Sequence, residues 1–149
     1  MRTIIITSGG FAPAHSGHIE CFNAARLLGD KLIVGVNSDE WLLRKHGKTF
    51  MTEQERLYII GQFKSVDESR LFDDTDGSAK QLILDVLNEY PNDKIVFAKG
   101  GDRTSDNIPE MDLIKDYSSS RLEFVFGVGG TNKKNSSSLI LRDYIEQTI

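Results

Sequence analysis

Residues 8–18 read Ser-Gly-Gly-Phe-Ala-Pro-Ala-His-Ser-Gly-His and connect an apolar run, Thr3 to Thr7, to a helix-forming run that starts near Ser16. Glycine has no Cβ, so Gly9 and Gly10 permit positive φ angles and let the main chain approach a bulky anion. We expect the Ser16 side chain to cap the helix, whose unpaired first-turn amides then face the end of the strand. This segment therefore predicts a strand-to-helix turn that binds phosphate.

Two histidines stand at the start of that expected helix. His15 and His18 are three residues apart, which places their side chains on one side of the turn, and each imidazole can donate a hydrogen bond to a phosphate oxygen. A Gly-Gly turn with a purely structural role is one alternative. A metal site is another, although no cysteine or third histidine lies nearby in the sequence. The combination of glycines and histidines favours an anion site.

Composition limits the class of protein. A chain of 149 residues with 39% hydrophobic residues predicts one domain, residues 1–149, with a single buried core. The net charge of −4 does not favour nucleic acid or an anionic membrane as a partner, and the single Cys21 cannot form an internal disulfide. No apolar run approaches the roughly 20 residues of a membrane span, and no signal-peptide pattern follows Met1. We therefore expect a cytoplasmic protein.

Strand-like and helix-favouring segments alternate along the chain. The strand-like runs are Thr3 to Thr7, Leu32 to Val36, a weaker one at Arg70 to Phe72, Lys94 to Ala98, and Leu122 to Phe126. The helix-favouring segments are Gly17 to Leu28, Thr52 to Phe63, Ala79 to Glu89, Asn107 to Tyr117, and Ser136 to Gln147. This pattern predicts an α/β fold, a doubly wound parallel sheet in which ligands bind at the carboxyl ends of the strands. The loops expected there are Ser8 to His18, Asn37 to Lys48, Lys99 to Arg103, and Gly127 to Ser138.

The second of these loops carries a basic cluster. Arg44, Lys45 and Lys48 lie within five residues, and together they could bind a triphosphate or an acceptor phosphate through charge-assisted hydrogen bonds. A solvated basic surface is the alternative. Arg56 follows in a helix capped by Thr52, where it could equally pair with an acidic neighbour.

The third and fourth loops also have features of anion sites. Gly100 and Gly101 permit close approach of the backbone to a ligand, and Asp102 can accept hydrogen bonds from hydroxyl or amino groups. The fourth loop ends at residues 136–138, three serines whose hydroxyls and amides begin a helix and suit β- and γ-phosphates. An N-cap with surplus serines is the alternative.

Residues 15–18, His-Ser-Gly-His, resemble the H-x-G-H signature of the nucleotidyltransferase superfamily that includes cytidylyltransferases and sugar-phosphate adenylyltransferases. Arg26 to Asp39 resembles the matching segment of both heptose-1-phosphate adenylyltransferases and glycerol-3-phosphate cytidylyltransferase. Lys99 to Asp102 is more similar to the heptose adenylyltransferases. The resemblance covers essentially the whole chain and implies a Rossmann-like nucleotidyltransferase fold.

The resemblance implies transfer of a nucleoside monophosphate from a nucleoside triphosphate, with ATP favoured, to a sugar phosphate, with release of pyrophosphate. It also implies Mg²⁺ carried with the nucleotide, no metal held by the protein itself, and a homodimer. A CTP-dependent cytidylyltransferase acting on glycerol 3-phosphate or a related phospho-alcohol is one alternative. A weakly active nucleotide-binding domain is the other, because Ala12 stands where the family usually has Asp.

The resemblance also implies roles for single residues. The implied catalytic residues are His15, His18 and Lys45. The implied nucleotide-binding residues are Ser8, Gly9, Gly10, Phe11, Gly17, Lys99, Gly101, Asp102, Ser136, Ser137 and Ser138. Those implied to contact the acceptor or its phosphate are Ala12, Lys48, Arg56 and Arg103. The cytidylyltransferases carry an Arg-Thr pair shortly before the hydroxyl-rich helix start. Here Lys133 and Lys134 supply positive charge from shifted positions, so the resemblance does not decide which nucleotide base is bound.

Overall fold

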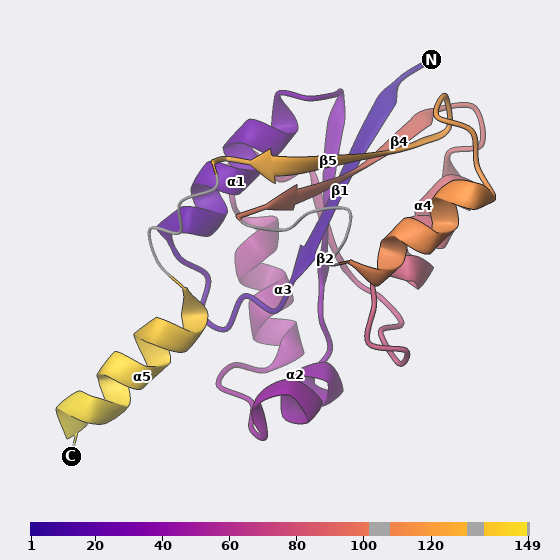
Figure 1. The fold of residues 1–149 in the computed structure, drawn as a ribbon. Coiled ribbons are helices and arrows are strands. Elements are labelled where there is room, and N and C mark those ends of the chain that lie inside the picture. Colours follow the sequence, from indigo (N-terminus) through magenta and orange to yellow (C-terminus); the bar gives the residue numbers. More distant parts are fainter. Residues whose placement is uncertain (102–107, 131–135, 149) are drawn as a thin grey trace.

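The computed structural model describes residues 1–101, 108–130 and 136–148. Its centre is a sheet of five strands that all run parallel, in the order β3-β2-β1-β4-β5 (Figure 1). The strands are β1 (Thr3–Gly9), β2 (Lys31–Val36), β3 (Glu68–Leu71), β4 (Lys94–Gly100) and β5 (Leu122–Val128). The predicted parallel sheet is therefore confirmed, with each strand within two residues of its expected bounds.

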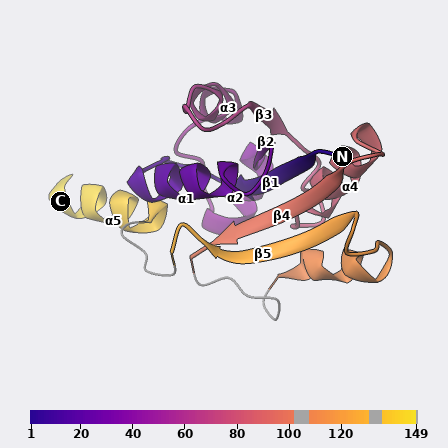
Figure 2. The same ribbon diagram turned by 90° about the horizontal axis from the view of Figure 1, so that it is seen from above.

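Helices cover both faces of this sheet (Figure 2). They are α1 (Ser16–Arg26), α2 (Asp39–His46), α3 (Glu53–Gly61), α4 (Lys80–Glu89), the 3-10 helix η1 (Pro109–Lys115) and α5 (Ser137–Thr148). The pair α1 and α3 packs on one face, whereas α4 and η1 pack on the other, which makes the fold doubly wound. Over the described ranges, no helix is long and apolar enough to cross a bilayer.

The central strand β1 shows why the apolar runs are nearly continuous. Ile4 and Ile6 belong to the core beneath α4 and η1, whereas Ile5 belongs to the core beneath α1 and α3. All three side chains are fully buried. Because successive residues of a strand point to opposite faces, a strand covered on both sides needs apolar residues at every position.

Two segments differ from the sequence prediction. The expected loop Asn37 to Lys48 contains α2. Ser38 is the N-cap of this helix, and Gly47, in the left-handed conformation, is its C-cap. The segment Asn107 to Tyr117, expected to favour an α-helix, forms the 3-10 helix η1 in the part that is described. Its buried residues Glu110 and Leu113 are three apart, so a helix with three residues per turn places both on the core face.

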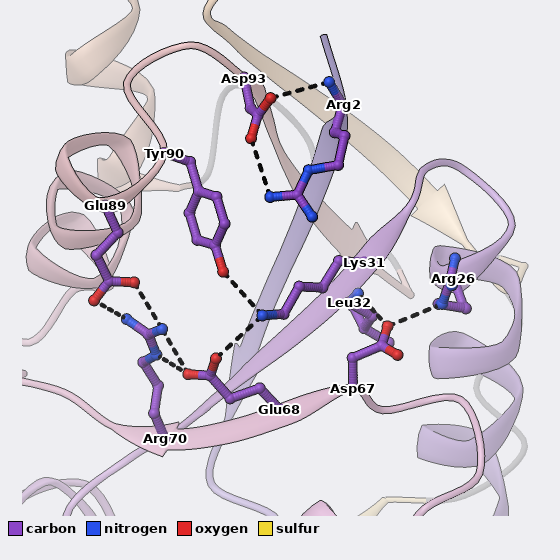
Figure 3. Close-up of polar contacts among 10 residues, drawn as sticks. All are labelled: Arg2, Arg26, Lys31, Leu32, Asp67, Glu68, Arg70, Glu89, Tyr90 and Asp93. Atoms are coloured by element: carbon purple, nitrogen blue, oxygen red, sulfur yellow. Dashed lines mark hydrogen bonds and ion pairs between the residues drawn. The ribbon is translucent and has the colours of Figure 1, made fainter.

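Charged side chains connect the strands to α4 away from the loops that follow the carboxyl ends (Figure 3). Lys31 Nζ donates to the Tyr90 hydroxyl at 2.9 Å and lies 3.6 Å from Glu68. Arg70 of β3 pairs with both Glu68 and Glu89, and thereby connects β3 to the end of α4. A partly exposed ion pair contributes at most about 1 kcal/mol to the free energy of unfolding. This network therefore adds only modestly to the stability that the buried core provides.

Candidate active site

A pocket of about 170 Å³ opens beyond the carboxyl end of β1, where the doubly wound fold predicts a ligand site. Its walls come from the loop after β1, from α1 and α2, and from the start of α5. Figure 1 shows α2 and α5 on this side of the sheet. The lining residues are Gly10, Phe11, Ala12, His18, Trp41, Leu42, Lys45, His46, Ser136, Ser137 and Ser138.

The two histidines of the signature are held by backbone amides. His15 is the N-cap of α1 and its Nδ1 accepts from the Gly17 amide at 3.1 Å, while His18 Nδ1 accepts from the His15 amide at 3.1 Å. The prediction that Ser16 caps α1 is wrong, because Ser16 is the first helical residue. Since Nδ1 of each ring is an acceptor, the neutral tautomer carries its proton on Nε2. Both rings therefore carry an Nε2–H donor. His18 lines the pocket, whereas the predicted catalytic residue His15 does not and instead packs against His18.

These imidazoles are uncharged at neutral pH. Burial, together with the neighbouring His15, lowers the pKa of His18 to about 4, and burial also lowers the pKa of His15. The two ring centroids lie 3.9 Å apart, and the edge of Phe11 packs against His18 at 4.9 Å between ring centroids. Two positive charges at this separation would repel each other. The pair is therefore suited to donating hydrogen bonds without carrying charge.

The glycines of the first loop are needed for space and not for positive φ. Gly9 and Gly10 do not adopt the positive φ that glycine permits, whereas Phe11 has a positive φ of 54°. A Cβ on Gly9 would lie 2.9 Å from the Phe11 ring, and one on Gly10 would lie 3.1 Å from a methyl group of Leu42. The loop therefore fits closely between its own aromatic residue and α2.

Helix α2 forms the opposite wall. Trp41 and Lys45 are four residues apart, as are Leu42 and His46, so both pairs lie on one helical face. Lys45 Nζ lies 4.6 Å from the centroid of the Trp41 ring. Lys45 was predicted from the sequence as a site residue, whereas Trp41, Leu42 and His46 were not. The signal was available, because Ser38 followed by two acidic residues predicts a helix start.

Arg56 does not line the pocket. Its side chain is fully buried, and the guanidinium donates to the carbonyls of Gly10, Asn37 and Met51 at 2.9, 2.6 and 2.9 Å. Its Nη2 also pairs with Asp39 at 2.9 Å. The acidic partner therefore comes from α2 and not from a neighbour in α3. Arg56 joins the loop after β1 to the end of β2 and to the start of α2.

The serines at the start of α5 contact the first loop. Ser136 Oγ accepts from the Leu139 amide at 3.1 Å and so caps α5. Ser137 Oγ donates to the Pro13 carbonyl at 2.7 Å. His18 in the first turn of α1 and the serines at the start of α5 thus line one pocket, where the positive end of each helix dipole favours an anion.

The sequence family described as cytidylyltransferase-like matches residues 6–142, which is most of the chain. The chain belongs to the cytidylyltransferase-like family. The bifunctional protein HldE of Syntrophotalea carbinolica is 32% identical over 145 residues, which are 96% of this chain and 28% of that protein. The bifunctional protein HldE of Trichlorobacter lovleyi is 30% identical over 148 residues, 98% of this chain and 28% of that protein. The chain thus spans little more than a quarter of these relatives.

Two solved structures have a similar fold. The lipopolysaccharide core biosynthesis protein of Thermoplasma volcanium superposes with a TM-score of 0.65 at 24% identity, covering 91% of this chain and all of that one. A putative nicotinate-nucleotide adenylyltransferase of Vibrio parahaemolyticus superposes with a TM-score of 0.65 at 14% identity, covering 99% of this chain and 89% of that one. At these identities the likeness concerns the fold, and the predicted Rossmann-like architecture is confirmed.

The other described residues that the cytidylyltransferase-like resemblance predicts do not line the pocket. Ser8 and Gly9 are the last residues of β1, and Gly17 lies in the first turn of α1. The others are Lys48, which is exposed after α2, and Lys99 and Gly101 at the end of β4. Asp102, Arg103, Lys133 and Lys134 lie outside the described residues. Among the residues that the structure does describe, no group of three or more His, Cys, Asp or Glu could hold a metal ion.

The lowered pKa of His18 predicts a pH dependence of stability. The folded chain binds this proton near pH 4, whereas unfolded histidine binds it near pH 6.5, so the stabilisation is complete above pH 6.5 and is lost as the pH falls towards 4. Between pH 7.5 and 4.5 we expect wild type to lose roughly 2–3 kcal/mol more unfolding free energy than His18→Asn. Urea titrations of both proteins at both pH values measure this, and equal losses would contradict it.

Proposed function

We propose that this chain is a nucleotidyltransferase that transfers a nucleoside monophosphate, with ATP as the favoured donor, to the phosphate of a sugar phosphate. The observation that carries the proposal is the histidine pair at the start of α1. His18 lines the pocket, His15 packs against it with 3.9 Å between ring centroids, and a backbone amide holds Nδ1 of each ring, which leaves the proton on Nε2. The relatives named HldE and the similarity of residues 99–102 to heptose-1-phosphate adenylyltransferases support a sugar phosphate as acceptor.

The reaction needs no covalent intermediate on the protein. An oxygen of the acceptor phosphate attacks the α-phosphorus, the bond from that phosphorus to the bridging oxygen of the β-phosphate breaks, and pyrophosphate leaves. The acceptor phosphate is largely ionised at pH 7, because its second pKa is about 6. The protein then contributes by placing the two phosphates in line and by stabilising the charge that moves towards pyrophosphate.

Each wall of the pocket has a role in this scheme. His18 in the pocket and His15 beside it donate to α- and β-phosphate oxygens, Lys45 supplies positive charge, and Ser136 and Ser137 hold the β- and γ-phosphates at the start of α5. Mg²⁺ bound to the triphosphate neutralises phosphate charge and enters with the substrate.

Three further expectations stay predictions: a single domain over residues 1–149, a homodimer and a cytoplasmic location.

Pyrophosphate release tests the proposal. ATP, CTP, GTP and UTP are each combined with a set of sugar phosphates and phospho-alcohols in the presence of Mg²⁺. We expect release with ATP and a sugar phosphate. Release only with CTP and glycerol 3-phosphate or a similar phospho-alcohol would overturn the choice of donor and acceptor but keep the transferase.

Ala12 favours a second candidate, a nucleotide-binding domain with little turnover. The side chain lines the pocket but offers only a methyl group where the family usually has a carboxylate. Nucleotide binding by calorimetry without pyrophosphate release from any pair would support this candidate. The variant Ala12→Asp would then be expected to gain turnover.

A further inference from the structure

Helix α2 forms one wall of the pocket with little support from the core. Of its eight residues only Leu42 is buried, yet Trp41, Lys45 and His46 must be placed accurately if the wall is to fit a ligand. An isolated helix of this length is not stable in water. Its position must therefore be fixed by contacts with neighbouring segments.

Asp74 supplies such contacts from the segment between β3 and α4. The side chain is 4% exposed and accepts three hydrogen bonds from residues at the start of α2. Oδ2 accepts from the Asn37 side-chain amide at 3.0 Å and from the Ser38 backbone amide at 2.8 Å. Oδ1 accepts from the Ser38 hydroxyl at 2.7 Å. A buried carboxylate with this many donors is costly to replace by a group that cannot accept them.

The contact with Ser38 also orients the helix cap. Because the Ser38 hydroxyl donates its proton to Asp74, its lone pairs stay directed towards the Trp41 amide, which donates to Oγ at 3.1 Å. The same segment holds the outer side of α2, since Arg44 donates to the carbonyls of Asp74 and Thr75 at 2.9 and 3.0 Å. These contacts act together on one short helix.

We propose that Asp74 is a positioning residue for the pocket, acting through Ser38 to fix α2 and thereby the locations of Trp41 and Lys45. Asp74 itself does not line the pocket. The hydrogen bonds alone support the inference that Asp74 fixes α2. The effect of Asp74 on substrate binding rests in addition on the proposed function.

The test compares Asp74→Asn with Asp73→Asn. Both variants remove one negative charge from the same segment. Asp73, however, is exposed, and within the described part of the chain it bonds only to Thr75 of its own segment, at 3.0 and 2.6 Å. Trp41 is the only tryptophan of the chain, so its emission and its quenching by acrylamide report the placement of α2. We expect quenching to rise in Asp74→Asn and to match wild type in Asp73→Asn. We also expect tripolyphosphate affinity, measured by calorimetry, to fall about tenfold in Asp74→Asn only.

A double-mutant cycle separates positioning from general destabilisation. In a Lys45→Ala background, Asp74→Asn should have little further effect on tripolyphosphate affinity, because the residue that it positions is gone. If Asp74→Asn does not fold, Ser38→Ala interrupts the same path and should raise Trp41 quenching in the same way. Unchanged quenching in the folded variant, or in Ser38→Ala where it is used instead, would overturn the inference. Absence of tripolyphosphate binding by wild type would instead overturn the proposed function, while the quenching comparison still tests Asp74.

Discussion

Replacing His18 with alanine is expected to lower kcat about 100- to 1000-fold, the usual effect of removing one fixed donor to a developing negative charge. His18 lines the pocket, and because its Nδ1 accepts from the His15 amide, the Nε2–H is the donor left for a ligand. The substitution also removes an acceptor from the capping box, which costs roughly 1 kcal/mol of folding free energy. Steady-state pyrophosphate release and a urea titration measure the two effects separately.

Two further variants assign these effects to the two ring nitrogens. His18→Asn keeps a side-chain acceptor near the position of Nδ1, so we expect near-normal stability but low kcat. His18→Gln places an amide N–H near the position of Nε2, so we expect it to recover part of the turnover and to lose the cap. An unchanged kcat in His18→Ala would remove His18 from the mechanism.

The sequence predicted the sheet well because both faces of the central strands are covered. Fully buried parallel strands need apolar residues at every position, and a sequence shows such runs directly. The histidine pair was also predicted, since residues three apart at a helix start necessarily lie close together. The hydrogen-bond partner of each imidazole nitrogen could not be predicted from the sequence. A histidine is rarely considered as an N-cap, and the serine beside it is the usual choice.

The wall formed by α2 was harder to predict for a different reason. The cluster of three cations in this segment favoured a basic loop. The helix signals, an N-cap at Ser38 and the four-residue spacing of Trp41 and Lys45, were not used. The contact between Ser38 and Asp74 joins residues that are 36 positions apart. Pairing over that distance depends on the order of β2 and β3 in the sheet, which one sequence does not specify.

Arg56 also acts over long distances in the sequence, and its replacement by methionine is expected to lower the unfolding free energy by about 3–5 kcal/mol. Methionine fills a similar volume but donates no hydrogen bonds. The partly buried carbonyl of Gly10 and the buried carbonyl of Asn37 would lose their shared donor, and the Asp39 carboxylate would lose its cation. Urea titration at pH 7.5 measures the change.

Arg142→Met is the matched control. Arg142 lies on α5 with 63% of its side chain exposed, and its carboxylate partners are 4.0 and 3.9 Å away, so we expect a change within about 0.5 kcal/mol. Arg56→Lys separates charge from geometry. It keeps the cation, but one ammonium cannot match the planar fork that reaches three carbonyls and a carboxylate, so most of the loss should remain. If Arg56→Met were as stable as Arg142→Met, the guanidinium would not be what holds the first loop, β2 and α2 together.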